Sequence, residues 1–380
     1  MLFHFESPDD REREVLERID GLKEKLKWQL HEPRRWVGSL RRLSFARAIQ
    51  GSNSIEGFDA KLDDAAAVAM GEEPLDADTK TQLALEGYRD AMTYVLQLAT
   101  ETDFEYSVQV VKSLHFMMTK HSLDNRPGLW RAGSVYVRKE ETGEIVYAGP
   151  DPDEVPTLMA ELVSYLKNDP GLPAPILGGM AHLNLVMIHP FRDGNGRMAR
   201  CLQSLVLARS GVLSPVFMSI EEYLGRNTQS YYDVLTEVGK GRWQPQNNAR
   251  PWVRYVLRAH LRQAMTLLRR VRESEKTWIE LERIAAGTKL PPRTIYALFD
   301  ASLGFRIRNS TYRGVLRDTG EEITEQTATR DLKQLVECGL LEPDGERRGR
   351  HYIAAAPIRR LRQALIAARD ARDDRDPFAD

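Results

Sequence analysis

The stretch His189-Pro-Phe-Arg-Asp-Gly-Asn-Gly-Arg-Met-Ala-Arg200 decides how this chain is interpreted. Gly194 and Gly196 bracket Asn195 directly before a segment whose apolar residues recur at helical spacing. A glycine-bracketed turn at a helix N-terminus directs several backbone N–H groups to one point, and the helix dipole adds partial positive charge there. The stretch therefore predicts an anion-binding turn at the start of a helix.

The charged side chains around this turn indicate what the anion is. Arg197 and Arg200 lie in the first helical turn, where cations oppose the dipole, and so favour a bound polyanion or carboxylate. Asp193 offers a hard oxygen ligand of the kind that Mg²⁺ prefers. His189 can accept a proton at neutral pH. A histidine before proline, or a Gly-x-Gly alone, is usually structural, but the combination indicates phosphoryl or nucleotidyl transfer to a hydroxyl.

Bulk composition sets the frame for this site. The chain has 380 residues, 42% of them hydrophobic, and a net charge of -1, so two or three domains are expected. No chain-wide field points to nucleic acid or membrane. Cys201 and Cys338 have no disulfide or metal spacing, which fits a reducing cytosol. The N-terminus lacks a signal-peptide pattern and the apolar runs are too short for a bilayer, so a cytoplasmic protein with no membrane partner is expected.

The first 270 residues are predicted to be almost entirely helical, because apolar residues recur at three- and four-residue steps. The exception is residues 126–152, where glycines and prolines surround two β-prone patches on either side of Gly143, and a short hairpin is predicted. The expected helices lie within residues 8–50, 76–100, 105–120, 154–166, 176–188, 197–210, 229–238 and 251–272.

Residues 277–357 change character. Short helical patterns at 278–286, 292–299 and 324–337 precede two strand-like segments around Asp344-Gly345, which is the pattern of a winged helix–turn–helix. The charged, alanine-rich tail at 358–380 is expected to form a final helix that ends in disorder.

The 189–200 loop resembles the motif of the Fic family, His-x-Phe-x-(Asp/Glu)-Gly-Asn-Gly-Arg-x-x-Arg, with every fixed position present. The resemblance extends over residues 77–262 and implies a mainly α fold: a Fic-type helical core with a β-hairpin flap. It implies transfer of AMP from ATP to a Ser, Thr or Tyr hydroxyl of a target protein or of the chain itself. It also implies Mg²⁺ or Mn²⁺ and a homodimer.

The resemblance assigns roles to individual residues. His189 would deprotonate the acceptor hydroxyl, Phe191 would anchor the loop in the core, and Asp193 would hold the metal ion. The catalytic set is His189, Asn195 and Arg197, and the nucleotide-binding set is Arg192, Asp193, Gly194, Asn195, Gly196, Arg197, Arg200 and, on the adenine side, Tyr231, Tyr232 and Leu235.

Two parts of this assignment have alternatives. Tyr231 and Tyr232 equally fit plain core positions, and Gly239 stands where some relatives carry asparagine, which leaves the base open. The hairpin near Gly143 looks like the family's flap, which would pair with a target segment as an added strand, but it also fits a simple surface hairpin.

The segment Ser52-Asn-Ser-Ile-Glu-Gly57 matches the inhibitory motif (Ser/Thr)-x-x-x-Glu-(Gly/Asn) of some Fic proteins at Ser52, Glu56 and Gly57. Arg200 needs an anion, and the Glu56 carboxylate can take the place of a γ-phosphate on it, expected as a bidentate pair. Glu56 would then block the productive triphosphate pose. The alternative is a helix end with an exposed glutamate.

The C-terminal segment resembles the winged helix–turn–helix often appended to bacterial Fic proteins. Small hydroxyls and basic side chains there suit DNA phosphate and base contacts, while a protein–protein or dimerisation module is the alternative. The basic and hydroxyl residues are Arg347, Arg348 and Arg350 in the wing, and Thr324, Thr327, Thr329, Arg330 and Lys333 on the recognition helix.

These observations predict an inhibitory helical region at 1–76, a Fic catalytic domain at 77–262, a helical linker at 263–276, a winged helix at 277–357 and a charged tail at 358–380. The leading hypothesis is a protein adenylyltransferase that Glu56 inhibits. Alternatives are transfer of UMP or phosphate, removal of AMP, or a DNA-binding regulator whose Fic domain only senses nucleotide. A pure sensor has no need of His189, which argues against the last.

Overall fold

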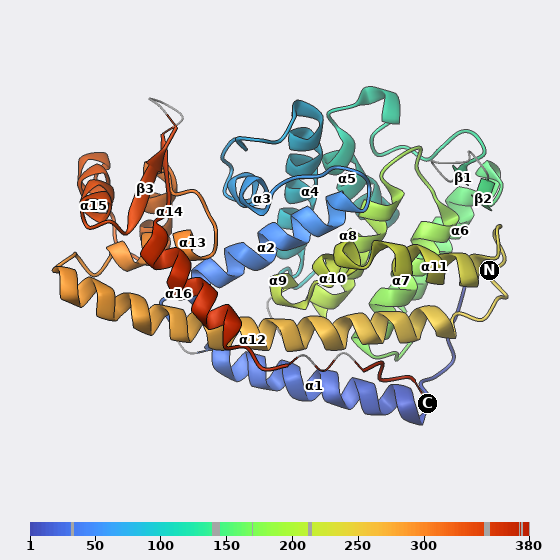
Figure 1. Cartoon of the computed structure of the whole chain (residues 1–380). Coiled ribbons are helices and arrows are strands. Elements are labelled where there is room, and N and C mark those ends of the chain that lie inside the picture. Colours follow the sequence, from blue (N-terminus) through green and yellow to red (C-terminus); the bar gives the residue numbers. More distant parts are fainter. Residues whose placement is uncertain are drawn as a thin grey trace.

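The computed structural model describes the chain except residues 32–33, 139–144, 169, 212–214, 346–349, 372, 374 and 380. The described part is mainly helical, with two separate antiparallel hairpins (Figure 1), which confirms the predicted fold class. The helices are α1 Asp10–His31, α2 Val37–Ser54, α3 Leu62–Ala69, α4 Thr79–Leu98, α5 Val108–Thr119, η1 Leu123–Asn125, η2 Pro152–Glu154, α6 Val155–Lys167, α7 Ala174–Ile188, α8 Asn195–Arg209, α9 Pro215–Met218, α10 Glu221–Arg226, α11 Thr228–Gly239, α12 Arg250–Thr288, α13 Thr294–Ser302, α14 Asn309–Asp318, α15 Glu325–Glu337 and α16 Ala356–Ala367; the strands are β1 Tyr136–Arg138, β2 Ile145–Ala148, β3 Leu341–Asp344 and β4 His351–Ala354.

The helices α7 and α8 form the centre of the protein. Both are buried on nearly every side, as expected for helices that are packed all round rather than along one stripe. They pack against each other, with α4 and α5 against α8 and with α6 and α12 against α7. The loop between α7 and α8 is residues 189–194, so the core holds the predicted anion-binding turn from both ends.

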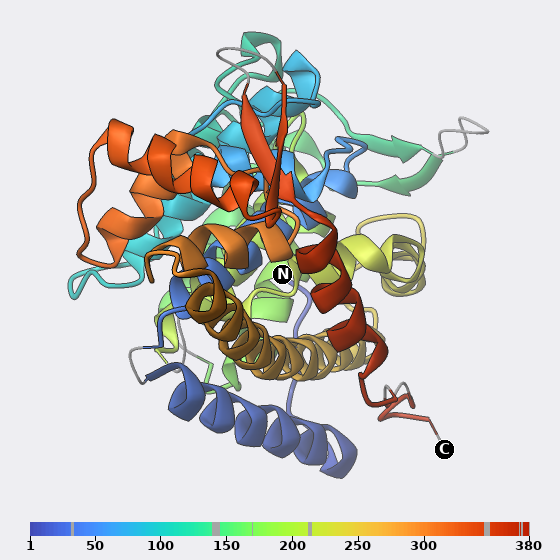
Figure 2. The same cartoon turned by 60° about the vertical axis from the view of Figure 1, so that its left-hand side comes forward.

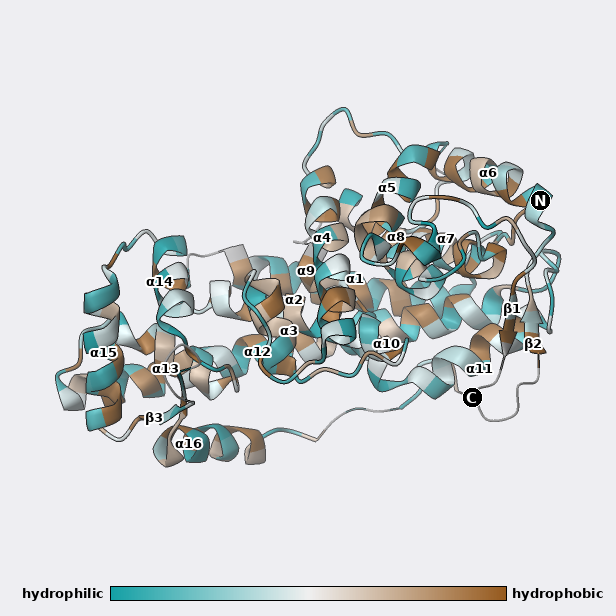
Figure 3. Cartoon of the chain, turned by 90° about the horizontal axis from the view of Figure 1, so that it is seen from above, coloured by the Kyte–Doolittle hydropathy of each residue, from teal (hydrophilic) through white to brown (hydrophobic). Residues whose placement is uncertain are grey.

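The helix α12 is one continuous element of 39 residues, with α1 packed along it (Figures 1 and 2). Figure 3 shows hydrophilic and hydrophobic residues alternating along α12, as an amphipathic helix requires. The separate helix predicted at 278–286 is wrong, because no glycine or proline interrupts residues 270–286 and the helix simply continues.

The helix α2 crosses α10 at backbone contact. A Cβ on Gly51 would lie 2.5 Å from the Glu221 carbonyl oxygen, and a Cβ on Gly225 would lie 2.7 Å from the Gly51 carbonyl oxygen. Only glycine fits at these two positions while the helices stay this close. The end of α2, which carries the predicted inhibitory motif, is therefore held firmly against α10.

The predicted hairpin forms from β1 and β2, with Val137 opposite Tyr147. The Tyr147 hydroxyl donates to the Met187 carbonyl at 2.7 Å, which ties β2 to the end of α7. The Gly241–Trp243 segment covers the other edge of β2, since Ala148 N donates to Gly241 O and Trp243 N donates to Ala148 O. The hairpin tip, including Gly143, lies outside the described residues.

The C-terminal segment contains three short helices, α13, α14 and α15, followed by the β3–β4 hairpin and α16. The helix α14 was not predicted. This segment packs against α2 and the α3 region (Figure 1). Arg42 of α2 donates to both oxygens of the buried Asp300 carboxylate at 2.7 and 3.0 Å, and Arg306 pairs with Asp63, Asp64 and Asp76.

The described part of the tail after α16 forms no further helix or strand. Arg369 pairs with Glu273 of α12 at 2.7 Å, Asp376 pairs with Arg258 of α12, and the Arg254 guanidinium lies 5.4 Å from the Phe378 ring centroid. The tail therefore returns along α12, where charged and aromatic side chains hold it. Among the described residues, no helix combines the length and the apolar character needed to cross a lipid bilayer.

Candidate active site

The 189–194 loop begins and ends in left-handed backbone. His189 ends α7 with φ 52°, and Gly194 begins α8 with φ 76°. The buried Asn195 side chain closes the loop, since its Oδ1 accepts from the Phe191 N–H at 2.9 Å and its Nδ2 donates to the Phe191 carbonyl at 3.0 Å. Asn195 therefore fixes the loop from within, and its amide is used by Phe191 rather than facing the anion site.

A ring stack supports the loop from below. Phe191 is fully buried and stacks on His115 of α5, with centroids 3.7 Å apart and an interplanar angle of 2°. The His115 Nδ1 accepts from Gly128 N at 2.9 Å, so its Nε2 carries the hydrogen and donates to the Asp193 carbonyl at 3.0 Å. Burial lowers the His115 pKa to about 4, which keeps this imidazole neutral.

The His189 imidazole is oriented as a base. Its Nδ1 lies 3.0 Å from the Val186 carbonyl, which can only accept, so Nδ1 carries the hydrogen and Nε2 keeps its lone pair. Burial lowers the His189 pKa below its ordinary value. Arg131 donates to the His189 carbonyl at 2.8 Å and so ties this residue to the start of the hairpin.

Asp193 is half exposed at the edge of the loop. One carboxylate oxygen accepts from Gly194 N at 2.6 Å and the other from Asn125 Nδ2 at 2.9 Å. No cluster of three or more metal-ligating side chains occurs in the described part of the chain. A Mg²⁺ ion here would thus take one protein carboxylate, and phosphates and waters would supply its other ligands, which is a common arrangement for Mg²⁺.

Arg197 and Arg200 bury two guanidiniums beneath the turn. The Arg197 Nε and Nη1 and the Arg200 Nη1 have no hydrogen-bond partner among the described residues. Unpaired donors at such depth are costly, because desolvation is not repaid. These donors fit an anion with several oxygens, such as a polyphosphate.

The predicted inhibitory motif occupies part of this site. Arg200 Nη2 donates to Glu56 Oε1 at 2.7 Å. The same guanidinium donates twice to Ser52: Nε to the Ser52 hydroxyl at 2.8 Å, and Nη2 to the Ser52 carbonyl at 2.9 Å. The expected bidentate pair is wrong: Glu56 accepts only from Nη2, while Nε donates to Ser52 and Nη1 has no partner among the described residues. A Cβ on Gly196 would overlap Glu56 Oε1, so the carboxylate lies directly on the first turn of α8. Gly57 follows with φ 77°.

The predicted adenine-side residues divide between core and surface. Tyr231 is 1% exposed, and its hydroxyl lies 3.0 Å from the His182 Nε2. Tyr232 is 43% exposed and donates to the Ile55 carbonyl at 3.0 Å, next to Glu56. Leu235 is partly buried and packs in the same apolar cluster as Tyr231. Arg192, a predicted nucleotide-binding residue of the loop, is exposed and donates to the Asp124 carbonyl at 2.8 Å.

Several residues that the motif did not identify complete the site: His115, Asn125 and Arg131, described above, and Phe58, whose ring centroid lies 5.1 Å from the Arg197 guanidinium. They come from four separate segments. Only tertiary packing brings them to the loop, so no sequence spacing could have identified them.

Comparisons with known proteins find one family. The family model described as Fic/DOC matches residues 105–207. The chain is 26% identical over 254 residues to "Protein adenylyltransferase Fic" of Nematostella vectensis, covering 65% of this chain and 54% of that protein. It is 30% identical over 161 residues to "Protein adenylyltransferase fic-1" of Caenorhabditis elegans, covering 42% and 28%. The chain thus spans about half the length of the first relative and less of the second.

The fold is also similar to solved structures. A Fic family protein from Desulfovibrio desulfuricans G20 superposes with a TM-score of 0.59 at 21% identity, covering 94% of this chain and 98% of that one. At this identity the likeness concerns the fold. It includes the arrangement of helices beyond the matched domain, since nearly the whole of both chains is covered.

Proposed function

Residues 105–207 form a Fic/DOC family domain, and from this premise we propose that the chain is a protein adenylyltransferase that Glu56 inhibits. The reaction would transfer AMP from ATP to a Ser, Thr or Tyr hydroxyl of a target protein or of the chain itself. One contact carries the proposal: a carboxylate from a distant segment sits on the buried Arg200 guanidinium and against Gly196, where a terminal phosphate fits.

The phosphate-binding part of the proposal follows from the unpaired donors. When Glu56 is displaced, the Arg200 guanidinium can bind a γ-phosphate. Arg197 offers two further buried donors to phosphate oxygens. Asn195 and Gly196 form the first turn of α8, where backbone N–H groups and the helix dipole favour an anion, whereas the Gly194 N–H donates to Asp193. Asp193 would hold Mg²⁺ or Mn²⁺, which would neutralise charge on the phosphates.

The base in this mechanism is His189. Its Nε2 would remove the proton from the acceptor hydroxyl while the oxygen forms a bond to the α-phosphorus. The bond between the α-phosphorus and the bridging oxygen breaks, pyrophosphate leaves, and the acceptor carries AMP. The lowered His189 pKa keeps the imidazole unprotonated at neutral pH, as this step requires.

The acceptor segment would bind at the β1–β2 flap. No described residue pairs with the outer edge of β1, whereas residues 241–243 cover the outer edge of β2. A target segment could therefore add as a strand along β1, between Tyr136 and Arg138. This would hold the acceptor by backbone bonds and leave its hydroxyl to His189.

The direct test compares Glu56→Gly with the parent in ATP and Mg²⁺. Removal of the carboxylate is expected to raise AMP incorporation about tenfold or more, because nothing then competes with the γ-phosphate for Arg200. Mass spectrometry should show the gain of one or more adenylyl groups. Asp59→Gly is the matched control, since Asp59 is exposed three residues further on. Equal incorporation in all three proteins would refute the inhibitory assignment.

Nucleotide choice and sensing are tested in the same background. The Glu56→Gly protein offered UTP, GTP and CTP, or an AMP-modified target, distinguishes AMP transfer from UMP transfer, phosphate transfer and AMP removal. The further change His189→Ala should abolish transfer but leave nucleotide binding. If cellular effects survive His189→Ala, the chain acts as a nucleotide sensor instead.

The C-terminal segment is proposed to be a winged helix that binds DNA. Thr329, Arg330 and Lys333 are exposed on α15, the helix before the β3–β4 hairpin, and can reach phosphates or base edges. Thr324 caps α15 by accepting from the Thr327 N–H, and the Thr329 hydroxyl accepts from Asn309 and donates to the Glu325 carbonyl. Of the wing arginines only Arg350 is described. A shift assay with random duplex at low salt tests this, and Arg330→Ala should weaken binding. Absence of binding at any salt favours a protein-binding module.

Two coarser expectations complete the proposal. Cys201 is buried and Cys338 exposed, and both are free, which suits a reducing cytoplasm. The homodimer implied by the family is tested by sedimentation of the full chain.

A further inference from the structure

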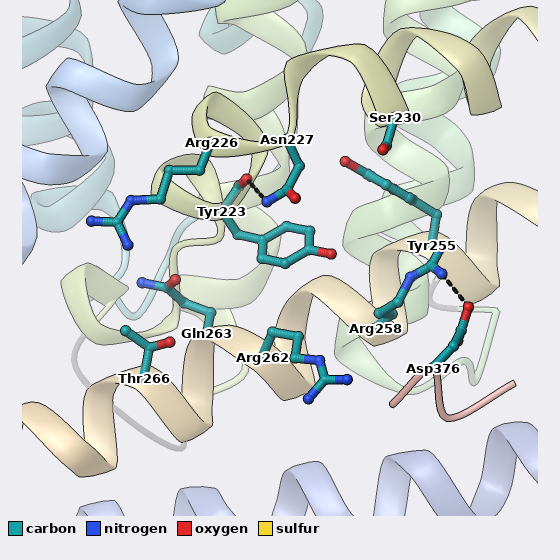
Figure 4. A pocket seen from close by; sticks show the side chains of 10 residues that line it. All are labelled: Tyr223, Arg226, Asn227, Ser230, Tyr255, Arg258, Arg262, Gln263, Thr266 and Asp376. Carbon is teal, nitrogen blue, oxygen red and sulfur yellow. Dashed lines mark hydrogen bonds and ion pairs between the residues drawn. The ribbon is translucent and has the colours of Figure 1, made fainter. Parts of the chain in front are cut away.

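A cavity separate from the active-site loop at residues 189–194 lies on the opposite side of α11. This cavity, of about 450 Å³, opens between α10–α11 and the middle of α12, with the C-terminal tail at its rim (Figure 4). Ser230 lines it, whereas Tyr232, two residues on and about 200° around the helix, donates to Ile55 beside Glu56. The cavity is therefore separate from the site at Arg200, and the proposed transfer reaction does not use it.

The cavity is strongly cationic. Arg226, Arg258 and Arg262 line it, and among its described lining residues Asp376 of the tail is the sole carboxylate. Arg226 pairs with Glu222 outside the cavity at 2.7 Å, but Arg270 also pairs with Glu222 at 2.5 Å, so Glu222 only partly offsets Arg226. The excess of guanidiniums attracts an anion.

The walls also offer an unused donor and flat rings. Tyr255 is 2% exposed, and its hydroxyl has no hydrogen-bond partner among the described residues. Burial raises the Tyr255 pKa, so the hydroxyl keeps its hydrogen. The Tyr223 ring lines the cavity, 6.3 Å from the Tyr255 ring with planes at 60°. Trp252 stacks on the Tyr255 ring and the Arg258 guanidinium lies over it, so an aromatic ligand would contact Tyr223 rather than Tyr255.

The tail already supplies a carboxylate to this cavity. Asp376 pairs with Arg258 (Figure 4), and the Arg262 guanidinium donates to the neighbouring Arg375 carbonyl. Asp376 Oδ1 also accepts from the Phe378 N–H at 3.0 Å, which fixes the carboxylate at the rim. A single carboxylate satisfies one of the guanidiniums and leaves the Tyr255 hydroxyl unpaired.

We propose that this cavity binds a small organic phosphate of mononucleotide size, which displaces Asp376. A phosphate presents more oxygens than the Asp376 carboxylate and can engage Arg258 and Arg262 together, since guanidinium forks match phosphate geometry. The Tyr255 hydroxyl donates to the same ligand, and the aromatic ring of the ligand stacks on Tyr223. A cavity of about 450 Å³ is within the range of small-molecule sites.

The test is calorimetric titration of the full-length protein with AMP, GMP, CMP and UMP, and with inorganic phosphate as the ligand without a ring. At least one mononucleotide is expected to bind more tightly than phosphate. Asp376→Asn should tighten that binding about tenfold by removing the competitor, and Arg262→Ala should weaken it about tenfold by removing a phosphate contact. Asp370→Asn, an exposed acid of the same tail outside the cavity, is the control and should change nothing.

If the nucleotide bound at the Arg200 site instead of this cavity, Asp376→Asn and Arg262→Ala would not change its affinity. The proposal is overturned if no mononucleotide binds, if phosphate alone binds as tightly, or if Asp376→Asn and Arg262→Ala both leave the affinity unchanged. Tyr255→Phe guards against a folding artefact, because it keeps the ring and deletes only the hydroxyl. Binding unchanged by Tyr255→Phe would also overturn the assigned contact, provided that the variants melt within a few degrees of the parent.

Discussion

Glu56 and Arg200, 144 residues apart in the chain, meet at 2.7 Å across the first turn of α8. The Arg200 side chain is 1% exposed and that of Glu56 is 26% exposed, so the pair combines a deeply buried cation with an accessible anion. Glu56 therefore compensates the charge of Arg200 in the nucleotide-free protein, and in the function proposed above it would also occupy the position of a phosphate.

This double effect predicts that Glu56→Gln lowers the stability of the nucleotide-free protein while it raises the response to nucleotide. Loss of the charge leaves Arg200 uncompensated, at a cost of about 1–3 kcal/mol. ATP with Mg²⁺ then supplies the missing anion, so its effect on the melting temperature should be larger than in the parent. Thermal melts with and without ATP measure both effects, with Asp59→Asn as control. A variant that is destabilised but gains nothing from ATP contradicts the prediction.

The pH dependence of transfer should report His189. Burial lowers its pKa, so the basic form persists as pH falls, and the acidic limb of the rate should lie below about pH 6.5. The Glu56 carboxylate acts in the opposite direction and raises the His189 pKa. In Glu56→Gly the limb should therefore lie lower still. Rates of AMP incorporation by this variant from about pH 5 to 8 test this, and a limb above neutral pH would exclude His189 as the base.

The helices and the loop could be predicted from sequence because their signals are local. The helical period and the fixed spacing of the loop residues need no information from the rest of the chain. The continuity of α12 was missed because the polar run at 273–277 interrupts the apolar pattern, although those residues favour helix. The short α14 was missed for a related reason, since Gly314 lies in its middle.

Contacts between distant segments could not be predicted in the same way. The Phe191 anchor was expected, but its partner His115 on α5 was not, because stacking depends on how α5 packs against α8. The same holds for Ser52, which was expected only as part of a motif and in fact accepts from both Nε and Nη2 of Arg200.

Two substitutions of Asn195 should separate its effect on loop stability from the effect of charge at the phosphate site. Asn195→Ala deletes both bonds to Phe191, so the loop loses its closure at a cost of about 1–3 kcal/mol, and transfer should fall by about 100-fold or more. Asn195→Asp keeps the acceptor for Phe191 N but loses the donor, and brings a negative charge to the phosphate site. It should therefore be nearly as inactive while being less destabilised. Chemical unfolding and rates in the Glu56→Gly background measure the two effects, and full activity of Asn195→Ala would contradict them.

Three buried histidines predict loss of stability in mild acid. Burial lowers the pKa to about 4 for His115 and to about 3 for His182 and His260. Each binds a proton near pH 6.5 only when the protein is unfolded, so stability is complete above pH 6.5 and falls as pH decreases below it. Each contributes up to about 1.4 kcal/mol per pH unit. Urea unfolding at about pH 7.5 and 5.5 measures how the free energy of unfolding changes with pH, and hence the number of protons bound on unfolding. His260→Leu should lower that number by up to one.

The contact between the C-terminal segment and the α2–α3 region depends on Arg306. Its guanidinium pairs with Asp63, Asp64 and Asp76, and its backbone N–H donates to Asp63 at 2.6 Å. The Asp64 side chain is 1% exposed, so loss of Arg306 leaves a buried carboxylate with no cation and with only the backbone N–H groups of Leu75 and Asp76 as donors. The Asp76 side chain is 41% exposed and keeps its ion pair with Lys61.

Arg306→Ala should therefore destabilise by about 2–4 kcal/mol, and Asp76→Ala should have a clearly smaller effect. Hydrogen exchange should show weaker protection of α2 and α3 in Arg306→Ala, since the segment that covers them is loosened. Arg317→Ala, at the exposed end of α14, is the matched control. An Arg306→Ala effect no larger than that of Asp76→Ala would mean that apolar packing, and not this ion-pair network, holds the two parts together.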